Sequence, residues 1–121
     1  MSRTDELNAV LSDLQSSSGD IEACAIVSED GLIIASSLPQ SIQENQIAAM
    51  SAAMLSMGVR TATELKRGSL EQLFVQGDKG YMVITQAGDY AVLLALAKKQ
   101  AKLGLVFLDV SRAAAKVKEI I

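Results

Sequence analysis

The sequence predicts an α+β fold built on a five-stranded antiparallel sheet, and three observations lead to this class. Helical and strand periodicities follow one another in the order α-β-β-α-β-β-β-α along the 121 residues. Within the hairpin and within the later meander, the strands are joined by turns too short for a crossover helix, so these strands pair antiparallel. The length suits one domain, spanning residues 1–121, which is long enough to bury a hydrophobic core.

The N-terminal elements are an amphipathic helix and a hairpin. Leu7, Val10, Leu11 and Leu14 recur at helical spacing, and the Ser- and Gly-containing stretch 16–20 ends the helix. Residues 21–27 form an apolar strand, the turn 28–31 reverses the chain, and residues 32–36 return as a second strand. Pro39 ends that strand.

A long helix is predicted from Ile42 to Lys66. Ser41 and Glu44 have the spacing of a capping box at its start, and Gly68 is placed to close its end in a left-handed conformation. At ~1.5 Å per residue such a helix is about 37 Å long. A domain of this size has a radius of gyration of only ~14 Å, so the helix spans the whole molecule.

The second half of the chain reads as a three-stranded meander followed by a helix. Strands are expected at residues 70–76, 81–86 and 90–97, separated by the turns 77–80 and 87–89. The last helix presents one apolar face, made of Leu103, Val106, Val110, Ala113, Ala114, Val117, Ile120 and Ile121.

Composition excludes several kinds of chemistry. The chain has no histidine, so it has no His-dependent catalytic system and no His-ligated metal. Phosphate-binding glycine motifs are absent, and a net charge of −3 argues against nucleic-acid binding. Cys24, alone in an apolar strand, is interpreted as a buried hydrophobe, and Lys98, Lys99 and Lys102 as a solvated loop. We therefore expect no enzyme activity, catalytic residue, cofactor or metal, and, without a membrane span or signal peptide, a cytoplasmic location.

The long helix carries more apolar surface than one sheet can cover. On a helical wheel, Met50, Met54, Met57, Gly58 and Leu65 form one stripe (the Met stripe), and Ala48, Ala52, Leu55, Val59 and Ala62 form another (the Ala stripe). Together they span about 220° of the circumference, whereas a surface helix needs little more than 100°. Either the helix is buried within its own domain, or one stripe packs on the sheet and the other meets a partner. We favour the partner, because a fold of 121 residues with one five-stranded sheet has little material left to cover a second side of so long a helix.

The element order and several segments resemble the roadblock (dynein light chain) family. These segments are 52–58, 68–75, 80–84, 88–93 and 103–106, together with the first helix and the turn 29–31. The resemblance covers almost the whole chain and implies a profilin-like sandwich. In that sandwich the sheet lies between the long second helix on one face and the terminal helices on the other.

The resemblance also implies a function, a non-enzymatic homodimer that regulates a small Ras-like GTPase and stimulates its GTP hydrolysis. Scaffolding, adaptor and small-molecule sensor roles are the alternatives. Carried over by position, the dimer interface comprises Ala48, Ser51, Ala52, Leu55, Val59, Ala62, Leu70, Glu71, Gln72, Leu73, Phe74 and Val75. The GTPase-binding residues would be Met50, Met54, Met57, Arg60 and Glu64. Which stripe faces the sheet stays open, so the Met stripe is an equal candidate for the dimer contact.

Overall fold

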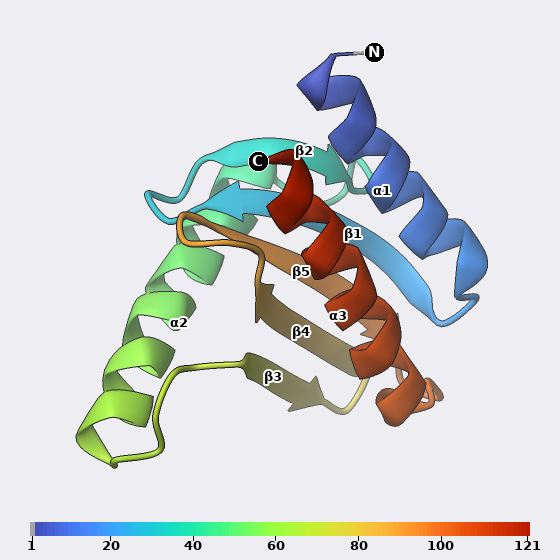
Figure 1. The fold of residues 1–121 in the computed structure, drawn as a ribbon. Helices are drawn as coiled ribbons and strands as arrows, with labels where there is room; N and C mark the ends of the chain where they lie inside the picture. Colours follow the sequence, from blue (N-terminus) through green and yellow to red (C-terminus); the bar gives the residue numbers. More distant parts are fainter. Residues whose placement is uncertain (1) are drawn as a thin grey trace.

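The computed structural model describes residues 2–121, and the predicted order of elements is confirmed (Figure 1). The elements are α1 (Arg3–Ser17), β1 (Ile21–Ser28), β2 (Ile33–Ser37), α2 (Glu44–Glu64), β3 (Gln72–Gly77), β4 (Gly80–Gln86), β5 (Ala91–Lys98) and α3 (Leu103–Ile120). The five strands form one antiparallel sheet in the order β2-β1-β5-β4-β3. The meander therefore occupies one side of the sheet and the hairpin the other.

Two hydrophobic layers hold the helices against the sheet. Strand β5 lies at its centre and contributes to both layers, because successive side chains point to opposite faces. Leu93 and Ala95 pack with α1 and α3, whereas Val92 and Leu94 pack with α2. Figure 1 shows the same division, with α1 and α3 on one side of the sheet and α2 on the other.

Both predicted ends of the long helix need correction. Helix α2 begins at Glu44 after Gln43, whose side chain makes no capping bond, so the expected capping box with Ser41 does not form. The Glu44 carboxylate instead accepts a 2.6 Å hydrogen bond from the Ser36 hydroxyl on β2. A tertiary contact thus replaces the local one.

The left-handed residue that closes α2 is Lys66, with φ of 57°, and not Gly68. The Arg67 amide donates to the Ala62 carbonyl at 2.7 Å, and the Lys66 amide donates to the Thr63 carbonyl at 3.1 Å. These two bonds define a Schellman motif, a closure in which glycine is the usual residue at the position of Lys66. The helix therefore ends at Glu64, two residues earlier than the sequence predicts.

The two edges of the sheet differ in how they are covered. At the β2 edge, the Ser37 hydroxyl donates to Gln15 of α1, and Ser36 is bonded to Glu44 of α2. Strand β3 has β4 as its neighbour on one side, and its other side is the edge of the sheet. The candidate site lies at the open edge of β3.

Candidate protein-protein interface

The face of α2 that packs on the sheet combines residues from both predicted stripes. Its buried residues are Ile47, Ala48, Ser51, Leu55 and Gly58. Ala48, Ser51 and Leu55 are 1%, 0% and 8% exposed, so these three expected interface residues lie against their own sheet and offer a partner no surface. Three members of the Met stripe stay accessible: Met50 and Met57 along one flank of this buried face, and Leu65 at the end of the helix.

An apolar groove separates the C-terminal half of α2 from β3. It has a volume of about 390 Å³ and is lined by Met54, Met57, Gly58, Thr61, Ala62, Arg67, Leu70 and Leu73. Gly58 sets the distance between its two walls, because a Cβ at this position would lie 2.7 Å from Leu73 Cδ1. The groove therefore joins the accessible Met stripe to the edge strand.

The edge strand itself is apolar and exposed. Phe74 and Val75 are 49% and 46% exposed, an unusual state for large hydrophobic side chains in a strand. Leu73 points to the α2 side, where it lines the groove, and Phe74 points to the α3 side. An exposed hydrophobic edge of this kind favours aggregation unless another strand covers it.

Helix α3 supports β3 from the other side. The rings of Phe74 and Phe107 meet edge to face, with centroids 5.6 Å apart. The Gln72 amide donates a 3.0 Å hydrogen bond to the Ser111 hydroxyl. Sequence analysis missed Phe107 and Ser111, because no local pattern relates them to a strand more than thirty residues earlier.

The outer face of α2 points away from the sheet and consists of Ala49, Ala53, Ser56, Arg60 and Glu64, all of which are exposed. Arg60 Nε lies 3.0 Å from Glu64 Oε1, one helical turn away. Val59 and Ala52 lie on the flank opposite the groove, with Val59 exposed and Ala52 half-buried. Of the predicted partner-binding residues, only Met54 is partly covered by its own chain.

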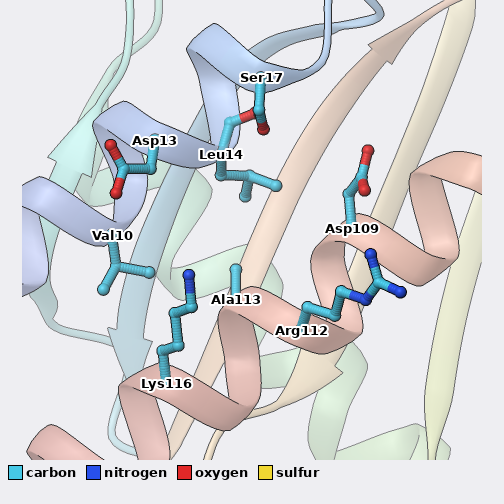
Figure 2. Close-up of a pocket in the computed structure, with 8 residues that line it drawn as sticks. All are labelled: Val10, Asp13, Leu14, Ser17, Asp109, Arg112, Ala113 and Lys116. Atoms are coloured by element: carbon cyan, nitrogen blue, oxygen red, sulfur yellow. The ribbon is translucent and has the colours of Figure 1, made fainter.

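A second cleft lies between α1 and α3 (Figure 2). Its volume is about 300 Å³, and charged residues dominate its rim: Asp13, Asp109, Arg112 and Lys116. Asp13 on α1 and Lys116 on α3 stand on facing sides of the cleft, with the small side chain of Ala113 at its floor (Figure 2). The lining of this cleft is mixed, with four charged residues beside Val10, Leu14 and Ala113, whereas pockets that hold small molecules are mainly apolar.

The single cysteine of the chain lines neither cleft. Cys24 is fully buried on β1, and burial raises the pKa of its thiol to about 11, so it is protonated at neutral pH. Over residues 2–121 no group of three or more Asp, Glu or Cys side chains is placed to hold a metal ion. Within the same range, no helix combines the length and the hydrophobicity that a membrane span requires.

A sheet covered by two terminal helices on one face and by a long helix on the other defines a profilin-like sandwich. The sequence matches the Roadblock/LC7 domain over residues 7–97, and the chain belongs to this family. It is also similar to two uncharacterized proteins of Methanocaldococcus jannaschii, MJ1340 and MJ0310. Each of these is 36% identical over 112 residues, covering 93% of this chain and 96% of the relative.

Solved structures confirm the fold. MglB of Myxococcus xanthus superposes with a TM-score of 0.91 at 22% identity, covering 99% of this chain and 90% of that one. An MglB structure with a tetrameric arrangement gives a TM-score of 0.90 at 20% identity, again covering 99% of this chain and 90% of that one. Profilin II of Acanthamoeba castellanii, at 13% identity and a TM-score of 0.67, covers 93% of this chain and 97% of its own. At these identities the likeness establishes the profilin-like roadblock fold.

Proposed function

We propose that this chain is a non-enzymatic homodimer that binds a small Ras-like GTPase and stimulates its GTP hydrolysis. The observation that carries the proposal is the open apolar edge of β3, which continues into the apolar groove beneath Met57. Membership of the Roadblock/LC7 domain family supports it, because members of the roadblock family pair through this strand and the long helix. The tetrameric arrangement of MglB adds a precedent for self-association in this fold.

In this proposal the second copy covers the β3 edge and the groove. The interface comprises the edge strand with Leu70 and Glu71 before it, and the groove residues Met54, Met57 and Ala62. A two-fold axis perpendicular to the sheet pairs the two β3 strands antiparallel and brings both α2 helices to the same face. Since a stable dimer buries about 800 Å² per partner, the strand edge needs the helix contact as well.

The outer faces of the two α2 helices then form the surface for the GTPase. Ala49 and Ala53 provide a flat central area, bordered by Met50 and by the Arg60–Glu64 ion pair. Arg60 is held by Glu64, and Arg67 Nε donates to the Leu65 carbonyl at 3.0 Å, so both arginines near this surface are already engaged. We therefore expect stimulation to come from ordering the GTPase's own residues and not from an inserted arginine.

The experiment combines the purified chain with a Ras-like GTPase encoded in the same genome and measures complex mass and single-turnover GTP hydrolysis. We expect a 2:1 or 2:2 complex and faster hydrolysis. Ala53→Arg should abolish binding while the dimer persists, and Arg60→Ala should change the hydrolysis rate less than threefold. Binding without acceleration would favour the scaffold alternative, and a loss of more than 100-fold with Arg60→Ala would show that an arginine is supplied in trans.

A further inference from the structure

The backbone of β3 determines which of its groups are free to pair. The hairpin between β3 and β4 closes with the pair Gly77–Gly80, around the two-residue turn Asp78–Lys79. In a two-residue hairpin the closing pair exchanges both of its hydrogen bonds, and bonded and non-bonded pairs then alternate along the strands. Residues 73, 75 and 77 therefore bond to β4, and the amide and carbonyl groups of residues 72, 74 and 76 point outward from the sheet.

We infer that the second copy pairs with β3 in a single register, with Phe74 opposite Phe74 of the second copy. This inference rests on the proposed homodimer and specifies its centre. The register makes 74–74, 72–76 and 76–72 hydrogen-bonded pairs, so all three outward-pointing residues of each strand are used. The result is a ladder of six backbone hydrogen bonds across the two-fold axis.

Side chains are complementary in this register. On the α2 side, Leu73 lies opposite Val75 of the second copy, which continues the apolar groove across the axis. Gln72 lies opposite Gln76 of the second copy, and the five residues 72–76 that pair with one another carry no charge. No like charges meet, and each large apolar side chain faces another.

On the α3 side the register gathers all the phenylalanines of the dimer. The chain has two, Phe74 and Phe107, and they already contact each other at 5.6 Å between ring centroids. Phe74 opposite its own copy extends this contact into a row of four rings, 107–74–74–107. In this arrangement a large aromatic side chain at position 74 is favourable, although Phe74 is half-exposed in one copy, because directly opposed aromatic pairs stabilise a sheet.

The two nearest registers that also keep the two copies of α2 on the same face are both poorer. Centring the axis on Val75 places Phe74 opposite Gln76 and Leu73 opposite Gly77 of the second copy. Centring it on Leu73 places Phe74 opposite Gln72 and Val75 opposite the exposed carboxylate of Glu71. Each leaves at least one outward-pointing residue of every strand outside the bonded ladder.

Single-cysteine cross-linking distinguishes the registers. A hydrogen-bonded pair has Cα atoms about 5.5 Å apart, within the range of a disulfide. In the inferred register Phe74→Cys forms a self-disulfide, whereas Leu73→Cys and Val75→Cys meet their own copies only on the diagonal, at about 8 Å, which is too far. Cys24, which is buried, is kept in all variants, and the wild-type chain is the control that shows whether Cys24 itself forms a cross-link.

A second arm retains the aromatic cluster. Gln72→Cys mixed with Gln76→Cys gives a heterodisulfide in the inferred register only, and Phe74 remains in place. Each variant is oxidised with copper phenanthroline and separated on a non-reducing gel, after light scattering has given the mass of the wild type. We expect at least tenfold faster cross-linking for Phe74→Cys and for the 72/76 mixture than for Leu73→Cys or Val75→Cys.

The outcomes separate the two proposals. Preferred cross-linking of Leu73→Cys or Val75→Cys overturns the register and leaves the homodimer intact. A wild-type dimer in which none of these positions cross-links removes β3 from the interface. A monomeric wild type overturns the homodimer, and the register with it.

Discussion

Met57 and Leu55 lie two positions apart on α2, and truncating each to alanine should give opposite outcomes. Leu55 is 8% exposed and packs on the sheet, whereas Met57 is 61% exposed and lines the groove. Leu55→Ala should lower the free energy of unfolding by about 2–4 kcal/mol, and the dissociation constant of the dimer of folded chains should not change. Met57→Ala should change folding stability by less than ~1 kcal/mol and weaken the dimer.

The size of the Met57 effect follows from its exposure. Complete burial of a methionine side chain is worth about 1.5–3 kcal/mol, so covering the 61% that is exposed gives about 1–2 kcal/mol. A two-fold symmetric dimer contains the residue twice, which makes about 2–4 kcal/mol per dimer. This corresponds to an increase of about 30- to 800-fold in the dimer dissociation constant.

Sedimentation velocity over a range of concentrations gives the dissociation constant, and thermal unfolding gives stability. Leu32→Ala is the matched control, because Leu32 has a similar exposure of 67% but precedes β2, at the opposite edge of the sheet. A dissociation constant that rises equally for Met57→Ala and Leu32→Ala would refute the assignment of the groove to the second copy. So would a Met57→Ala dimer of unchanged affinity.

Three further predictions concern the fold that holds this surface. Lys66→Gly should raise the free energy of unfolding by about 0.5–1 kcal/mol, because it removes a side chain from a left-handed backbone conformation. Gly68→Ala should lower the free energy of unfolding, because it adds a side chain at a φ of 89°. Chemical denaturation measures both changes. Gly80→Ala should cost at least ~2 kcal/mol, since its Cβ would lie 2.7 Å from the Ala97 carbonyl oxygen inside the sheet, and a melting temperature within ~3 °C of wild type would contradict this. The raised pKa of Cys24, about 11 against 9.0, means that the unfolded chain loses its thiol proton first, so stability should fall between pH 9 and 11 more steeply in wild type than in Cys24→Ala.

Local patterns in the sequence were sufficient to predict every helix and strand. Periodicity and turn chemistry are properties of neighbouring residues, so the hairpin, the meander and the last helix lie within a few residues of their predicted limits. The ends of α2 were predicted less well, because their outcome depends on contacts across the fold. Glu44 bonds to Ser36 on β2, and the chain turns at Lys66 to bring Leu70 into the groove.

The orientation of α2 could not be predicted, for a related reason. Its wheel has two apolar stripes of similar width, and the sequence does not contain the crossing angle that selects between them. The sheet selects the arc between the stripes, because Gly58 and Ser51 allow the helix backbone to approach Leu73 and the strands. As a result, residues expected at the surface, such as Leu55, are buried, and Met57 remains accessible.

The distribution of exposed apolar side chains around β3 argues for a second strand over any partner that docks on one face. Met57 and the groove lie on the α2 side, whereas Phe74 lies on the α3 side with Leu108, which is 44% exposed and one turn before Ser111. A protein bound to α2 alone would leave Phe74 in water. A strand added at the edge extends both faces of the sheet at once, so it can cover Val75 and Phe74 together. Because residues 72–76 complement themselves when reversed, a second copy of the chain would supply such a strand.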